Sequence, residues 1–228
     1  LSLSMNDLLN KSLKQLNKIA KRLTSNYGEQ LKVQCACSVG FAADAIKAYA
    51  GENKIDLVVM GMKGKSQLVE KFIGSTTTSV LKNSKIPILI IDRRVRYKSI
   101  QKIVLACDYT TIKNKNIIEP LLALCQLFKS HIYVLNVVKE VEMEPTISST
   151  VAGFRLNRLL ENVSHSFHFA LGDDVVEAIN TYVKKMKIEM VVMIPHLHSV
   201  LQRIFHPSLS QQMSFHTKNP LLILPEID

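Results

Sequence analysis

The sequence predicts two doubly wound, parallel-sheet α/β domains in tandem, within residues 1–95 and 100–228. Apolar runs of strand length alternate with segments whose apolar residues recur at helical spacing, as in a parallel sheet covered by helices on both faces. Residues 40–91 also repeat at 173–224, with a constant shift of 133 and no gap. A repeat of this length indicates a duplicated domain.

The elements of the first copy follow from apolar spacing and from the turn signals between segments. The sequence predicts helices at 5–26, 41–50 and 75–83, and strands at 31–37, 55–60 and 87–91.

The second copy is longer at its start than the first. Its predicted strands are 102–107, 132–138, 165–169, 190–194 and 221–224, and its predicted helices are 113–129, 151–163, 173–186 and 208–215. Residues 102–164 of the second copy are predicted to form a strand, a helix, a strand and a helix, whereas the corresponding part of the first copy has only residues 1–30. We therefore expect the given chain to lack the first copy's opening strand–helix–strand, which leaves the strand at 31–37 without a neighbour.

The net charge of +10 is unevenly distributed along the chain. Residues 1–98 hold 17 Lys/Arg and 7 Asp/Glu, whereas residues 99–228 hold 12 of each. An anionic small ligand in the first copy would explain this asymmetry. The basic residues are dispersed and are not interleaved with aromatic residues, which argues against a nucleic-acid partner.

Apolar runs and cysteine spacing bear on location. The longest apolar runs, such as 86–91, are far shorter than the roughly 18 residues of a membrane span, so we expect no membrane partner. The four cysteines show no zinc-like spacing. Cys35 and Cys37 are expected to serve as small apolar residues on a strand, and a reducing cytoplasm is the simplest location.

A glycine motif is the strongest candidate site. Gly61-Met62-Lys63-Gly64 follows a predicted buried strand, and Gly74-Ser75-Thr76 comes nine residues later at the start of a helix. Open α/β sheets bind ligands at this strand-to-helix turn. Glycines let backbone N–H groups approach a phosphate closely, and a helix start with hydroxyls and nearby Lys63 favours an anion.

Glycine spacing alone does not establish a ligand site. A glycine turn followed by a Ser/Thr helix cap occurs in many proteins without a ligand. A Walker A loop is excluded, because Gly64-Lys65-Ser66 would require a glycine where the chain has Val59. The second copy has Ile194, Leu197 and Pro207 in place of the three glycines, so nucleotide is expected only against the first copy.

The sequence offers no catalytic constellation and no metal centre. It has no Gly-x-Ser-x-Gly elbow, no HExxH and no paired carboxylates near the glycine motif. All seven histidines lie in the second copy, with His196, His198, His206 and His216 in or beside its altered loop. No Cys or carboxylate is spaced with them, which favours a bulky filling of the loop over a metal site. A pH-responsive surface is a further hypothesis.

The motif Gly-x2-Gly-x9-Gly-Ser, with the preceding Asp56-Leu57-Val58-Val59-Met60 and the closing strand Pro87–Ile91, resembles the universal stress protein family. The resemblance covers both copies and implies adenine-nucleotide α-hydrolase-like domains. In the ATP-binding members the glycines and the serine hold the phosphates. By resemblance Gly61, Gly64, Gly74 and Ser75 take this role, with Met62, Lys63 and Thr76 beside them, and ATP, with or without Mg²⁺, is the expected ligand.

The same resemblance implies an Asp at the end of the opening strand that contacts the adenosine. The first copy's Asp is not in the given chain, and in the second copy Asp108 stands at that position. Because the second copy has lost its glycines, we expect Asp108 to cap a helix instead.

The resemblance implies a regulatory nucleotide-binding protein of the stress response that is not an enzyme, or hydrolyses ATP only slowly. The alternative is an interaction or scaffold protein with a vestigial nucleotide site. A true ATP-dependent enzyme would need a second substrate motif, which the sequence lacks. Family members associate through their last strands, so we expect Pro87–Ile91 and Leu221–Leu224 to meet in an internal pseudo-dimer, with further self-association.

Overall fold

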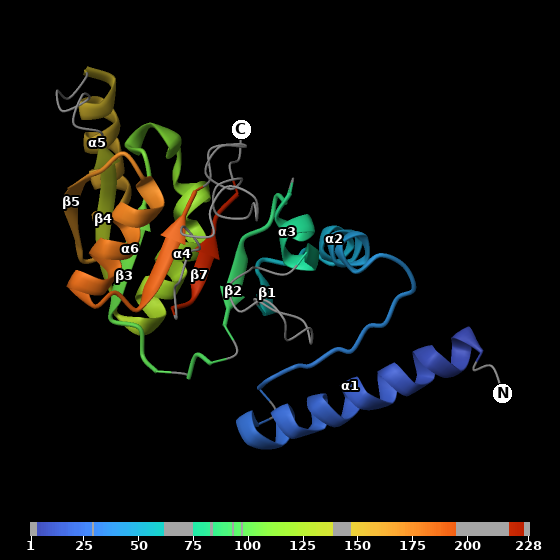
Figure 1. Cartoon of the computed structure of the whole chain (residues 1–228). Helices are drawn as coiled ribbons and strands as arrows, with labels where there is room; N and C mark the ends of the chain where they lie inside the picture. The colour runs from blue at the N-terminus through green and yellow to red at the C-terminus, as the bar shows by residue number, and fades with distance from the viewer. Residues whose placement is uncertain are drawn as a thin grey trace. The chain divides into compact units, whose positions relative to one another are not determined.

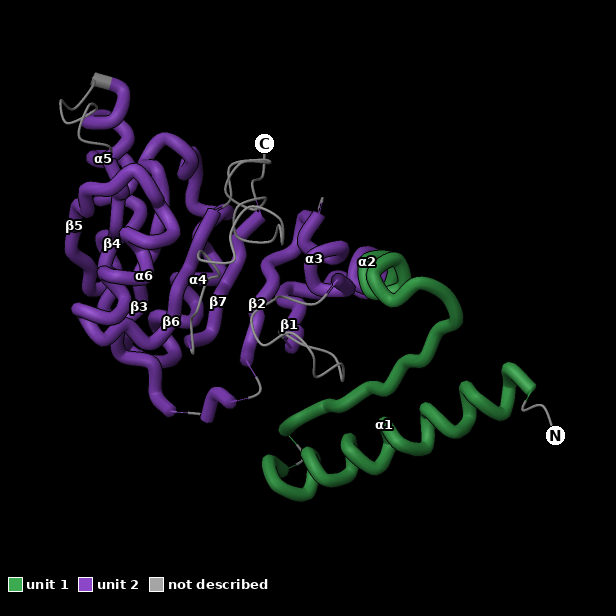
Figure 2. Tube along the Cα trace, in the orientation of Figure 1, with its two compact units in different colours: residues 1–49 green, residues 50–228 purple. Residues whose placement is uncertain are grey.

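The computed structural model describes residues 4–28, 30–61, 75–82, 84–92, 94–96, 98–138, 147–194 and 219–225. The chain divides into two compact units, residues 1–49 and residues 50–228 (Figure 2). The repeat boundary expected between residues 95 and 100 lies inside the second unit and stays a prediction.

The first unit begins with the long helix α1 (Met5–Tyr27), as the sequence predicts. A capping box starts it: the Ser4 hydroxyl accepts a hydrogen bond from the Asp7 amide, and the Asp7 carboxylate accepts one from the Ser4 amide. These two bonds satisfy N–H groups that a helix start leaves unpaired. The helix ends at Gly28, whose φ of 82° is a conformation that glycine adopts without strain.

Residues 31–39 contain no strand, so the strand predicted at 31–37 is wrong. A strand is held by backbone hydrogen bonds to a neighbouring strand. The structure gives this segment no such ladder within the residues it describes. Cys35 and Cys37 lie here as free thiols, with Cys37 exposed, and do not form a strand face. Helix α2 (Ala42–Glu52) follows.

The second unit is built on a seven-stranded sheet in the order β1-β2-β7-β6-β3-β4-β5 (Figure 1). The strands are β1 (Val58–Gly61), β2 (Ile88–Ile91), β3 (Lys102–Ala106), β4 (His131–Val138), β5 (His165–Leu171), β6 (Met190–Met193) and β7 (Leu221–Ile223). All neighbours are parallel except β2 and β7, which are antiparallel with Leu89 opposite Leu222. The predicted α/β fold and the predicted meeting of the two last strands are thereby confirmed.

Helices and one 3-10 turn connect these strands. They are α3 (Ser75–Leu81), η1 (Tyr109–Thr111), α4 (Lys115–Phe128), α5 (Ile147–Leu159) and α6 (Val175–Met186). One large apolar cluster joins α4 and α5 to a single face of the sheet, with Ile103, Leu121 and Leu156 among its fully buried members. Helix α6 packs on β4 and β5, where its Tyr182 contacts His168. Because neighbouring strand residues point to opposite faces, α6 covers the face opposite to Phe167 and the apolar cluster.

The offset of 133 between the two copies holds in three dimensions. Strand β1 pairs with β2 in the register in which β6 pairs with β7, with every partner shifted by 133. Lys54 and Lys187 occupy equivalent positions after α2 and α6, and both adopt the left-handed conformation, with φ of 49° and 55°. The local geometry therefore repeats along with the sequence.

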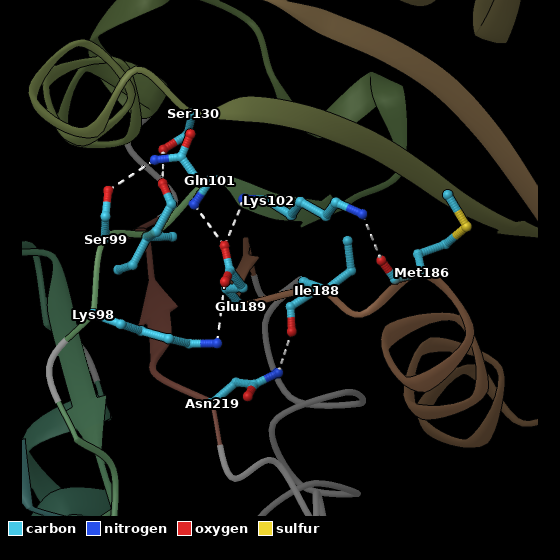
Figure 3. Close-up of polar contacts among 10 residues, drawn as sticks. Lys98, Ser99, Gln101, Lys102, Ser130, Met186, Ile188, Glu189 and Asn219 are labelled. Carbon is cyan, nitrogen blue, oxygen red and sulfur yellow. Dashed lines mark hydrogen bonds and ion pairs between the residues drawn. The ribbon is translucent and has the colours of Figure 1, made fainter.

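A polar network fixes the start of β3 beside the start of β6 (Figure 3). The Glu189 carboxylate accepts hydrogen bonds from the amides of Gln101 (2.6 Å) and Lys102 (3.1 Å), and it forms an ion pair with Lys98 (3.1 Å). Burial alone would raise the pKa of Glu189, but the two amides and the Lys98 ammonium outweigh it, so the pKa is lowered. Glu189 thus anchors the segment that leads from the first copy into the second.

Candidate functional site

The candidate site is the turn from the end of β1 to the start of α3. The Thr77 hydroxyl, from the first turn of α3, donates a hydrogen bond to the carbonyl oxygen of Gly61 at 3.2 Å. Thr77 is 3% exposed whereas Gly61 is exposed, so this bond is partly buried. It brings together the two described ends of the glycine motif, Gly61 and Ser75, although 13 residues separate them in the sequence.

Gly61 is exposed at the end of β1. A Cβ atom added to it would meet no atom of the described residues within 4 Å, and its φ is not positive. Neither backbone strain nor local crowding therefore explains why a glycine stands here. The same holds for Gly51 on α2, so these properties permit the close approach of a further group at Gly61 but do not require one.

The structure describes three of the seven predicted site residues. Gly61 ends β1, and Ser75 and Thr76 open α3 with exposed side chains. The other four, Met62, Lys63, Gly64 and Gly74, lie outside the described residues. Thr77 was missed, although it continues the polar run that starts at Ser75. Its role depends on a contact with β1 that helical spacing alone does not reveal.

The corresponding turn of the second copy begins differently. Ile194 stands where the first copy has Gly61, and it is 6% exposed within the large apolar cluster. The rest of this loop, including Leu197, Pro207 and the four histidines at 196, 198, 206 and 216, lies outside the described residues. The strand end that carries Gly61 in the first copy therefore carries a core residue, Ile194, in the second copy.

Asp108 caps the 3-10 turn η1, as predicted. Its carboxylate accepts hydrogen bonds from the Thr110 amide and the Thr110 hydroxyl, both at 2.9 Å. Burial, and secondarily the Asp108 charge, raise the pKa of the Cys107 thiol and keep it protonated.

A chain of hydrogen bonds joins two histidines, one on β4 and one on β5. His131 hydrogen-bonds Ser164 through Nδ1 (2.7 Å) and Ser166 through Nε2 (2.8 Å), and Ser166 continues to His168 Nε2 (2.8 Å). Burial lowers the pKa of His131, and the nearby His165 and His168 lower it further. Within the described part of the chain no cluster of three His, Cys, Asp or Glu side chains could hold a metal ion.

None of the helices among the described residues is long and apolar enough to cross a membrane.

The mostly parallel sheet, its covering helices and the glycine at a strand-to-helix turn define a doubly wound α/β protein of the adenine-nucleotide α-hydrolase-like class. Residues 2–92 match the family model described as the Universal stress protein family. Over this part of the chain, the protein is similar to the universal stress protein family, as the relatives below also indicate.

Two curated relatives illustrate the likeness in sequence. A universal stress protein of Synechocystis sp. is 40% identical over 70 residues, which cover 31% of this chain and 24% of the relative. A universal stress protein of Methanocaldococcus jannaschii is 30% identical over 99 residues, which cover 41% of this chain and 61% of the relative. The chain thus spans less than two thirds of the length of these relatives.

Solved structures share the fold at low identity. A universal stress protein from Archaeoglobus fulgidus matches with a TM-score of 0.71 and 16% identity, covering 100% of this chain and 81% of that chain. A protein from Pseudomonas aeruginosa, described as functionally unknown, matches with a TM-score of 0.63 and 15% identity, covering 93% and 77%.

Proposed function

We propose that this protein binds ATP, or another adenine nucleotide, at the end of β1 and acts as a non-catalytic regulator of the stress response. The observation that carries the proposal is the hydrogen bond from Thr77 to Gly61, which holds the start of α3 at the end of β1. It gathers an open glycine backbone and two exposed hydroxyls at one turn. Parallel α/β sheets bind nucleotides at such a turn.

In this proposal the residues divide the work of binding a polyphosphate. The backbone of Gly61, Gly64 and Gly74 gives the phosphates close access, because no Cβ stands in the way. The hydroxyls of Ser75 and Thr76 donate hydrogen bonds, and Lys63 beside Met62 supplies positive charge. Mg²⁺, where present, neutralises part of the phosphate charge. The sequence offers no acid–base pair for fast hydrolysis, so any ATPase activity is slow.

Location and partners belong to the same proposal. All four cysteines are free thiols, which fits a reducing cytoplasm. The ligand is a nucleotide rather than a nucleic acid, because the basic residues are dispersed along residues 1–98 and are not interleaved with aromatic residues that could stack on bases.

Isothermal titration of the whole chain with ATP tests the proposal. Gly61→Ala should weaken ATP binding by about tenfold or more, equivalent to about 1.4 kcal/mol, because the added methyl group occupies the space of the phosphate. The fold should be unaffected, since the structure leaves that space open. Gly51→Ala is the matched control: it adds the same methyl group, also into open space, on α2 and should leave ATP affinity unchanged.

Two results would contradict the proposal. If the folded wild-type chain binds no ATP at millimolar concentration, the nucleotide-independent scaffold role is favoured instead. If Gly61→Ala and Gly51→Ala bind ATP equally well, the nucleotide lies elsewhere on the protein.

A further inference from the structure

Strand β5 is the long open edge of the sheet. It pairs with β4 over seven residues and has no second partner among the strands that the structure describes. The last strands of the two copies are in the opposite situation, because β2 lies between β1 and β7, and β7 lies between β2 and β6. These last strands therefore offer no edge to another chain, whereas β5 does (Figure 1).

The hydrogen bonds to β4 determine which backbone groups of β5 point outward. The Ser164 carbonyl accepts from the Ile132 amide, and the Gly172 amide donates to the Val138 carbonyl. In a parallel ladder the backbone groups of every second residue point to the same neighbouring strand, so the even-numbered residues of β5 form the hydrogen bonds to β4. The N–H and C=O groups of the odd-numbered residues His165, Phe167, Phe169 and Leu171 therefore point away from the sheet.

This edge lacks the usual protection against pairing. Edge strands are normally guarded by charged side chains, proline or a bulge. The segment His165–Leu171 contains no Lys, Arg, Asp, Glu or Pro, and its register with β4 runs without a bulge. Phe169 is 65% exposed and Leu171 is 52% exposed. Within the described part of the chain, the strand thus offers both unpaired backbone groups and apolar side chains.

We propose that β5 pairs in antiparallel orientation with β5 of a second copy of this chain, about a two-fold axis at His168. This register is the one that uses all four outward-facing residues of both strands. It sets Phe167 opposite Phe169 of the second copy, and His165 opposite Leu171. The strand has no fixed charge, so two copies meet without like-charge repulsion, and the partner's equally apolar face covers the exposed phenylalanine. The strand is complementary to itself, which selects a second copy as the occupant.

Sedimentation velocity over a concentration series tests this pairing. The wild-type chain should form a concentration-dependent dimer. Phe169→Lys should abolish it, because the lysine places a charge opposite the apolar Phe167 of the second copy. Leu127→Lys is the matched control: Leu127 is also an exposed apolar residue (72%), but it lies on α4, and its replacement should leave the dimer intact.

Disulfide trapping tests the register. In a background with Cys35→Ser and Cys37→Ser, His168→Cys should cross-link on oxidation, because residues facing across such an axis lie about 4.5 Å apart at Cα and a disulfide spans that distance. Ala170→Cys, on the same face, should not cross-link, because its equivalent lies about 13 Å away along the strand.

The proposal is overturned if the wild-type chain remains monomeric at high concentration, or if Phe169→Lys dimerises as well as the wild type. Cross-linking of Ala170→Cys as fast as His168→Cys would overturn the assigned axis. None of these measurements involves nucleotide, so their failure leaves the proposed ATP site untouched.

Discussion

Gly61 and Ile194 occupy the same position in the two copies of the repeat, yet their surroundings are opposite. Gly61 is exposed, with no described atom within 4 Å of an added Cβ, and Ile194 is buried in the apolar cluster. The strands that lead to them share their sequence pattern and the register of their pairing. The comparison teaches that one backbone path can end either at an exposed turn or in the core, with a glycine at the exposed end and an isoleucine at the buried one.

The neighbouring strands explain part of this difference. Strand β6 lies between β3 and β7, and all four of its residues are buried. Strand β1 pairs with β2 alone among the described strands, and its residues alternate between half-buried and exposed. The same apolar sequence therefore forms the centre of a sheet in one copy and a sheet edge in the other.

Replacing each of the two equivalent residues with alanine should give the largest contrast. Ile194→Ala should lower the free energy of unfolding by about 2–5 kcal/mol, because it leaves a cavity in the core. Gly61→Ala should change it by less than about 0.5 kcal/mol, because its methyl group enters open space. Urea unfolding of both variants measures the difference. Equal losses would mean that the strand ends do not differ as described.

The acidic residue before each strand gives the second contrast. Glu189→Gln should cost about 1–2 kcal/mol, since a neutral amide replaces the charged acceptor of the Gln101 and Lys102 amides. Asp56→Asn, at the equivalent position, should cost little, because Asp56 is exposed. Chemical unfolding at neutral pH compares the two variants.

The lowered pKa of Glu189 predicts how this contribution depends on pH. It should be fully present above the ordinary glutamate pKa, and it should be lost as pH falls through the lower pKa of the folded state. In Glu189→Gln that part of the acid dependence should disappear. An unchanged acid profile would assign the stabilisation to other carboxylates.

Removing the Thr77 hydroxyl should have a smaller effect. Thr77→Val keeps the shape of the side chain but loses the hydrogen bond to Gly61, at a cost of about 1 kcal/mol. ATP affinity should fall as well, because α3 is no longer held against the end of β1. Unfolding and titration on one preparation separate the two effects. Unchanged affinity despite lost stability would make Thr77 a purely structural residue.

The smallest expected effect concerns acid sensitivity, which should arise in the second copy because all seven histidines lie there. The lowered pKa of His131 means that the folded state resists a proton that the unfolded state accepts. Stability should therefore fall as pH drops from about 6.5 through the lower pKa of the folded state.

His131→Gln should flatten this part of the profile, although His165, His168 and Tyr133 remain beside it. Thermal unfolding across mildly acidic pH compares the variant with the wild type. Identical slopes would show that His131 does not set the dependence.

Most of the fold could be predicted from periodicity. Nearly every predicted helix and strand that falls on described residues is present. The meeting of β2 and β7, which the family resemblance implied, is present as well. Helix α5 begins at Ile147, earlier than the predicted start at Val151. The prediction placed the start too late because Ser148, Ser149 and Thr150 resemble loop residues in the sequence.

The errors are those that local patterns cannot avoid. The run at 31–37 has strand composition but lacks a ladder, and a strand depends on its neighbour as well as on its own residues. Thr77 was missed because its role is set by a contact with Gly61, 16 residues away. The glycines stand out in the sequence by their spacing, but only Gly61 among them is described, so their role as a binding site stays a prediction.

The antiparallel pairing of β2 with β7 takes place within a single polypeptide. Dilution cannot separate the two strands, and neither can become matched with a strand from a different gene product. In a symmetric assembly of identical subunits, every mutation changes both subunits, because one gene encodes them. Here a codon change reaches one half only, so one strand end could keep its glycine while the other acquired Ile194, with no compromise imposed between them.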